Sequence, residues 1–143
     1  MPSRAQSTAE SKSDAVLRGV CWVQGIYFLV TGIWPIVHIE SFMDVTGIKF
    51  DIWLVKTVGA LITVIAIVLL TGAWRRRISL EVVLLAVLSS AALAVVDVYY
   101  SSVVNRIPKI YLADAVPELI FIALWLVLYP RSSAALEGRR ASP

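Results

Sequence analysis

The sequence predicts an all-α fold, a polytopic membrane protein whose four transmembrane helices pack as a bundle. Hydrophobic residues make up 59% of the chain, charged residues make up 16%, and the mean hydropathy is +0.80. Soluble domains carry about 25% charged residues, so the solvent predicted for most of this chain is lipid. Four segments are long enough to cross a bilayer, and little chain remains for another domain.

The four predicted spans follow one another closely. Each holds about 20 or more mostly apolar residues, the length that a helix needs to cross the hydrocarbon core. Residues 38–51, the arginine triplet at 75–77 and residues 101–109 connect them, so we expect sequential antiparallel packing. The spans are predicted at residues 16–37, 52–74, 78–100 and 110–129.

Both ends of the chain are polar and rich in small residues. Residues 1–15 and 131–143 are therefore predicted to be disordered tails that flank a transmembrane domain at residues 16–130. A cleaved signal peptide is the alternative for the first span. Its apolar run is longer than a signal h-region, and no small-x-small cleavage site follows it.

The distribution of basic residues predicts the orientation. Nine Lys and Arg residues lie on the side of the bundle that carries both termini, and four lie on the other side. By the positive-inside rule both termini are then cytoplasmic. A basic rim on anionic lipid accounts for the net charge of +3 and the pI of 9.2, so no nucleic-acid partner is expected.

Apart from Arg18 and Glu81, the ionisable residues inside or next to the spans lie on the non-cytoplasmic side. Asp114 and Glu118 are i, i+4 neighbours in the fourth span, and Asp97 lies near the outer end of the third. Lys56 shares a helical face with the small residues Gly59, Ala60 and Thr63, which predicts that it faces the bundle. Packed together, the polar or small faces of these helices predict an outward-facing polar pocket. Lys56, Asp97, Asp114 and Glu118 would line it, with His38 at its mouth.

Two interpretations of this pocket stay open. In one, Lys56 holds the acids in a structural salt-bridge network. In the other, the pocket binds a ligand or handles protons, since intramembrane ionisable residues commonly mark such sites. Pro117 lies between the acids and removes the hydrogen bond to the carbonyl of Ala113, so a kink is expected that either serves the pocket or only bends the helix.

Other features have structural interpretations. Glu81 lies at i+4 from Arg77 and is expected to pair with it. In the connection at 38–51, Ser41 and Asp44 form a capping-box pattern, Gly47 can end a short helix, and the apolar side chains favour an interfacial anchor or a lid. Most tryptophans lie near span ends and predict an aromatic belt: Trp22, Trp34, Trp53, Trp74 and Trp125.

No cofactor or metal site is expected. The single cysteine, Cys21, cannot form an internal disulfide, and no Cys or His cluster has ligand spacing. Expected partners are the bilayer, a small or lipidic ligand, and a second copy or a larger membrane complex.

The runs "GIYFLVTGIWPIVHIESFMDVTGIKFDIWLVKTVGALI" and "VVDVYYSSVVNRIPKIYLADAVPELI" resemble small bacterial four-helix membrane proteins, similar in organisation to the DoxX-like families. The resemblance covers about residues 16–130. DoxX-like proteins are linked in general terms to membrane redox systems, but no haem, flavin or quinone motif is present. The resemblance therefore implies a fold and a place in the inner membrane of a bacterium, and it assigns no substrate or catalytic residue.

Three classes of function are compatible with these observations. The first is ligand binding or proton handling in the outward-facing pocket. The second is an accessory subunit without chemistry of its own, in which the polar faces of the helices dock on a larger membrane complex. The third is a membrane-embedded isomerase or hydrolase that uses the carboxylates as acid and base, although no catalytic signature supports it.

Overall fold

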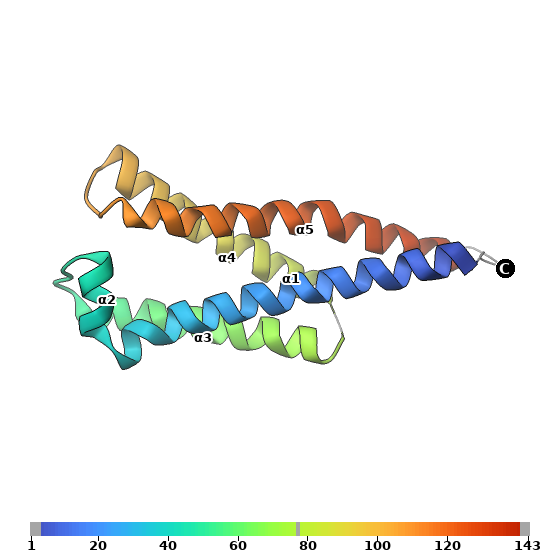
Figure 1. Ribbon diagram of the computed structural model, residues 1–143, viewed down its shortest axis with the longest axis horizontal. Coiled ribbons are helices and arrows are strands. Elements are labelled where there is room, and N and C mark those ends of the chain that lie inside the picture. Colours follow the sequence, from blue (N-terminus) through green and yellow to red (C-terminus); the bar gives the residue numbers. More distant parts are fainter. Residues whose placement is uncertain (1–3, 77, 141–143) are drawn as a thin grey trace.

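The computed structural model describes residues 4–76 and 78–140, and within these ranges every regular element is a helix (Figure 1). Four of the helices contain segments long and apolar enough to cross a membrane, at Asp14–Val37, Ile52–Trp74, Leu80–Val103 and Ile110–Pro130. The predicted all-α four-helix bundle is confirmed, with the architecture of a multi-pass membrane protein. The elements are α1 (Arg4–Val37), α2 (Ile39–Thr46), α3 (Ile52–Trp74), α4 (Leu80–Val98), the π-helical turn η1 (Tyr99–Val103) and α5 (Ile110–Arg140).

The long helices lie lengthwise, and the connections gather at two ends (Figure 1). At one end lie α2 and the turn between α4 and α5, and we refer to it as the α2 end. The other end carries both termini and the turn between α3 and α4, and we refer to it as the termini end. The outer side of the predicted topology corresponds to the α2 end.

Helix continues into both segments for which disorder is predicted. The first helix starts at Arg4, and α5 passes Pro130 and ends at Arg140. Both extensions contain alanine, leucine, glutamate or lysine, which are good helix formers, and they grow from helices that are already nucleated. Residues 1–3 and 141–143 lie outside the described part of the chain.

The third predicted span, at 78–100, is divided differently in the structure. Helix α4 begins at Leu80 after an extended Ser79, and η1 follows it directly. The amide of Val104 donates to the carbonyl of Tyr99 at 3.0 Å, which is the i→i+5 bond of a π-helix. This wider turn follows Asp97 by two residues, and π-turns within helices often occur near functional sites.

Helices α1 and α3 form one closely packed pair, α4 and α5 form another, and the two pairs meet mainly where α1 lies along α5. The backbones of α1 and α3 pass close to each other at two glycines. A Cβ atom on Gly59 would lie 2.6 Å from the carbonyl oxygen of Gly32, and one on Gly32 would lie 2.8 Å from the carbonyl oxygen of Gly59. Small residues at this crossing let the backbones touch, as is common in membrane helices.

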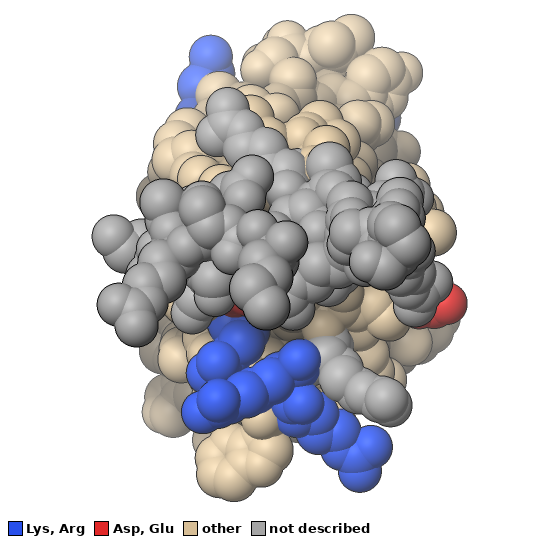
Figure 2. All heavy atoms as spheres, turned by 90° about the vertical axis from the view of Figure 1, so that its right-hand side faces the viewer, with Lys and Arg blue, Asp and Glu red and all other residues tan. Residues whose placement is uncertain are grey.

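The outer surface of the spans is apolar. Val23, Leu61, Leu88 and Leu126 each expose about 60% of their side chains, one on each long helix. Such a surface fits lipid as the solvent, whereas a soluble monomer rarely exposes apolar patches of this extent. At the termini end, lysine and arginine side chains gather on one side of the visible face (Figure 2). Arg75 and Arg76, in the turn between α3 and α4, are exposed.

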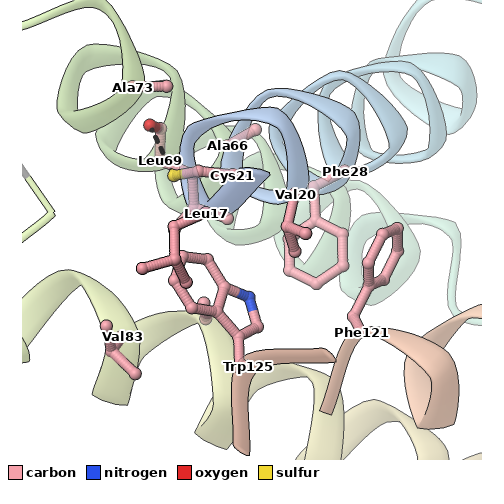
Figure 3. Close-up of a cluster of buried hydrophobic side chains, with 11 residues drawn as sticks. Leu17, Val20, Cys21, Phe28, Ala66, Leu69, Ala73, Val83, Phe121 and Trp125 are labelled. Atoms are coloured by element: carbon pink, nitrogen blue, oxygen red, sulfur yellow. Dashed lines mark hydrogen bonds between the residues drawn. The ribbon is translucent and has the colours of Figure 1, made fainter. Parts of the chain in front are cut away.

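The buried apolar core lies between the middle of the bundle and the termini end. All four long helices contribute to it, and Trp125 and Phe28 are its largest fully buried apolar side chains (Figure 3). Cys21 lies in this core and donates its thiol hydrogen to the carbonyl of Leu69 at 3.2 Å, so it behaves as a small buried residue.

Candidate functional site

Three acidic side chains from two helices gather inside the bundle near the α2 end. Asp97 on α4 is 6% exposed, Glu118 on α5 is 1% exposed, and Asp114 on α5 is half-buried. The three carboxyl groups lie within electrostatic reach of one another. We call them the carboxyl cluster. The i, i+4 spacing brings Asp114 and Glu118 to one face, and the α4–α5 pairing brings Asp97 opposite them.

The hydrogen bonds of the carboxyl cluster are incomplete. Oδ1 of Asp114 accepts a hydrogen bond from the hydroxyl of Tyr27 on α1. Oδ2 of Asp97 and both carboxyl oxygens of Glu118 are buried without a hydrogen-bond partner. Buried polar atoms are normally satisfied, so these three oxygens indicate a place that a proton, water or ligand completes.

Lys56, for which a position inside the bundle is predicted, has an exposed side chain. The buried face of α3 runs through Gly59, Ala66 and Leu69, and Lys56 lies on its flank, near the level at which α1 ends. Within residues 4–76 and 78–140 no ion pair joins Lys56 to the carboxyl cluster. The salt-bridge interpretation therefore loses its cation.

His38 is exposed as well, and its role in the structure is local. It is the N-cap of α2, where its Nδ1 accepts a hydrogen bond from the amide of Ser41 at 3.4 Å. Gly47 ends α2 with a φ of 85°, as expected for a glycine stop. The capping-box pattern of Ser41 and Asp44 is not used in the predicted form, because the helix starts three residues earlier than that pattern implies.

A pocket of about 270 Å³ lies next to the carboxyl cluster, between α1, α2 and α5. Asp114 lines it, together with Tyr27, Trp34, Phe42, Thr46 and Tyr111. Four of its nine lining residues are aromatic, Thr31, Ile110 and Ala113 complete the lining, and Asp114 is its acidic group. Asp97 and Glu118 lie behind Asp114 and do not line the pocket themselves.

Helix α2 forms one wall of this pocket. The indole Nε1 of Trp34 donates to Oγ of Ser41 at 2.8 Å, and the rings of Trp34 and Phe42 meet edge to face with centroids 5.5 Å apart. These contacts fix α2 against the end of α1. The segment at 38–51 is predicted to be either an interfacial anchor or a lid, and the position of α2 in the pocket wall corresponds to the lid.

Lys49 lies beside the pocket, in the connection between α2 and α3. Its ammonium donates to the carbonyl oxygens of Thr46 at 2.7 Å and Gly47 at 2.9 Å, and it lies 5.3 Å from the ring centroid of Tyr111. Partial burial lowers the pKa of Lys49. The ammonium group of Lys49 therefore contacts backbone carbonyls and an aromatic face, and these contacts do not include the carboxyl cluster.

A second polar group lies deeper, between the carboxyl cluster and the apolar core. Nε2 of Gln24 donates to Oγ of Ser90 at 2.9 Å and to the carbonyl of Ala86 at 3.0 Å, while Nε1 of Trp125 donates to Oε1 of Gln24 at 2.6 Å. Ser90 also lies beside Glu118. Beyond Trp125 the core shown in Figure 3 is apolar, so the row of polar side chains that runs from the carboxyl cluster through Gln24 ends at Trp125.

Two of these residues correct or extend the sequence predictions. Trp125 is 1% exposed and bonded to Gln24, so its assignment to an aromatic belt is wrong. Tyr27 was not predicted as a site residue. A signal was present, because Gln24, Tyr27 and Thr31 are spaced i, i+3, i+7 and therefore share one face of α1.

The arrangement limits the chemistry of the site. Three carboxyl groups close together in a low dielectric cannot all carry a negative charge without a compensating cation. They therefore either share protons among themselves or bind a cation. Among the residues that the structure describes, no group of three His, Cys, Asp or Glu side chains is arranged to hold a metal ion.

Comparisons with protein families, with curated proteins and with solved structures find no match to this chain. The resemblance to DoxX-like families therefore stays a prediction, and the function has to be argued from the pocket and the carboxyl cluster.

Proposed function

We propose that this chain is a ligand-binding and proton-handling protein of a bacterial cytoplasmic membrane, with both termini in the cytoplasm. The pocket then opens to the outside at the α2 end. The observation that carries the proposal is the carboxyl cluster, whose three acids are held inside the bundle without a basic partner among the described residues. Intramembrane acids are costly, and such residues commonly mark proton or ligand sites.

The polar side chains inside the bundle support a pocket that is closed toward the termini end. Polar side chains continue from the pocket to Gln24 and Trp125, and the apolar core lies between them and the termini end. Among the described residues, the buried cluster beyond Trp125 offers a proton or ligand no polar side chain other than the Cys21 thiol. The arrangement favours binding at the outer side over passage through this single chain.

The proton-handling part is tested by labelling protonated carboxyl groups. The purified protein in nanodiscs is treated at pH 7 with a hydrophobic carbodiimide, which reacts with protonated acids, and the labelled residues are identified by mass spectrometry. Free Asp and Glu side chains have pKa values of about 4 and are ionised at this pH. We expect labelling within the carboxyl cluster, with Glu118 as its most buried member, and its loss in Glu118→Gln.

The exposed acid Asp44 on α2 is the internal control and should stay unlabelled. Infrared spectroscopy provides the second measurement, because a protonated carboxyl group has a carbonyl stretch that an ionised one lacks. Absence of both the label and this stretch across Asp97, Asp114 and Glu118 would show that the cluster is fully ionised and would overturn the proposal.

The orientation has its own test. A reporter that is active only in the cytoplasm is fused after Pro143, and one that is active only in the periplasm is inserted in the turn at residues 104–109. Activity of both supports the proposed topology. Activity of a periplasmic reporter at the C-terminus would place the pocket on the cytoplasmic side.

A further inference from the structure

We infer that the ligand of the pocket is a small organic cation, an amine or quaternary ammonium compound with an apolar body. This inference rests on the proposed function and names the class of ligand. It starts from the charge of the site. Asp114 lines the pocket, and Asp97 and Glu118 lie behind it with three buried carboxyl oxygens that have no partner.

A single positive charge in the pocket lies against Asp114, the acid of the cluster that lines it, and offsets the negative charge of the carboxyl cluster. Asp114 has one oxygen bound by Tyr27, and a carboxylate accepts several hydrogen bonds, so the group can also receive an N–H donor or face a quaternary ammonium. Lys56, the cation predicted from the sequence, is exposed and does not supply this charge. The ligand then supplies the positive charge that no described residue places against Asp114.

The walls of the pocket favour the same class. Four of its nine lining residues carry aromatic rings: Tyr27, Trp34, Phe42 and Tyr111. Aromatic faces attract ammonium groups, and binding sites for quaternary ammonium compounds are often aromatic cages. The protein already uses one of these faces for a cation, since the ammonium of Lys49 lies 5.3 Å from the ring centroid of Tyr111.

The size of the pocket limits the ligand. Pockets for drug-sized molecules occupy about 300–1,000 Å³, and this one is about 270 Å³. A compact monoamine with one ring or a short chain fits this volume, whereas a long polyamine or a complete phospholipid does not. The ammonium headgroup of a lipid has the same chemistry as a free amine, and the experiment below separates the two.

Binding of the cation is coupled to release of protons. The titratable groups that face Asp114 are Tyr27 from α1, Asp97 from α4 and Glu118 and Tyr111 from α5, while Lys49 lies beside the pocket from the α2–α3 connection. A cation next to Asp114 favours the ionised form of the neighbouring acids. Amine affinity should therefore rise as the pH is raised and the carboxyl cluster loses protons.

The test compares phenethylamine with 2-phenylethanol, which has the same ring and chain but no charge. Both are titrated by calorimetry into wild-type protein in nanodiscs of phosphatidylglycerol, a lipid without an amine. We expect saturable binding of one amine per chain, at least about tenfold tighter than the alcohol, as for a buried charge pair. Equal affinity for both compounds, or binding of neither, would overturn the inference without the need for any variant.

Two variants then test whether Asp114 is the acid that distinguishes the amine from the alcohol. Asp114→Asn keeps the shape of the side chain and should remove most of the preference for the amine, while Asp44→Asn makes the same change on the exposed side of α2 and should leave it unchanged. A preference that survives in folded Asp114→Asn protein contradicts the assignment.

The remaining comparisons separate related outcomes. Nanodiscs with phosphatidylethanolamine should weaken amine binding several-fold if the lipid headgroup is the natural occupant, and should not change it if the natural ligand is a free amine. Carbodiimide labelling without amine binding means that the carboxyl cluster handles protons but that this ligand class is wrong. Loss of both means that the proposed function itself fails.

Discussion

The hydroxyl of Tyr27 on α1 donates a hydrogen bond to the carboxyl group of Asp114 on α5, although the two residues are 87 positions apart in the chain. This bond joins the α1–α3 pair to the α4–α5 pair at the pocket. It also fixes one oxygen of the acid that lines the pocket. Tyr27 therefore connects the packing of the bundle to the geometry of the candidate site.

Replacing Tyr27 with Phe should destabilise the protein by about 1–3 kcal/mol, because it leaves the half-buried carboxyl group of Asp114 without its donor. Thermal unfolding in detergent measures the loss. Tyr99→Phe removes the same hydroxyl from an exposed tyrosine and should have almost no effect. Equal changes in the two variants would show that the Tyr27 bond contributes nothing to stability.

Gly59→Ala should destabilise the bundle by about 1–3 kcal/mol, because the new methyl group would meet the backbone oxygen of Gly32 at 2.6 Å and force α1 and α3 apart. Gly19→Ala on α1 is the control. A Cβ atom there has nothing within 4 Å, so the better helix propensity of alanine should stabilise the protein slightly. Unchanged unfolding of Gly59→Ala would mean that the close crossing is not required.

Gln24→Leu should cost about 1–3 kcal/mol, because it leaves the buried indole N–H of Trp125 without its acceptor. Trp125→Phe removes the donor and leaves space in the core, so it should destabilise as well. If the two side chains interact as the hydrogen bond indicates, the double variant loses less stability than the sum of the single variants. Additive losses would contradict a direct interaction between them.

Lys56→Met should change the free energy of unfolding by less than about 0.5 kcal/mol, because the lysine is exposed and has no partner among the described residues. The same substitution at Lys49 should cost about 1 kcal/mol, since it removes the hydrogen bonds to the carbonyls of Thr46 and Gly47. A large loss in Lys56→Met would restore the salt-bridge interpretation.

The acids of the site were predictable for a simple reason. Asp114 and Glu118 interrupt an otherwise apolar span, and i, i+4 spacing places them on one face whatever the neighbouring helices do. Asp97 shares a stripe with Ser90 and Ala94, and all three are buried in the structure. A polar stripe on a membrane helix avoids lipid, so its direction follows from the solvent alone.

Lys56 was not predictable in the same way. Its face contains Gly59, which is buried against α1, but a Cβ atom on Gly59 would meet Pro35 and Ile36 near the end of that helix. The partner helix stops near the level of Lys56 and no longer covers its flank. A long cationic side chain near a span end can also reach the interface, which removes the need for a partner.

The sequence by itself determined that the chain is helical and where its four spans lie, because lipid requires apolar residues over about 20 positions and backbone hydrogen bonds within each segment. Tertiary structure alone decided which polar groups meet. Tyr27 with Asp114, and Gln24 with Trp125, come from helices that are far apart in the chain. Their contacts depend on the rotation of each helix about its axis and on where its neighbour ends, and those are results of packing that no local pattern contains.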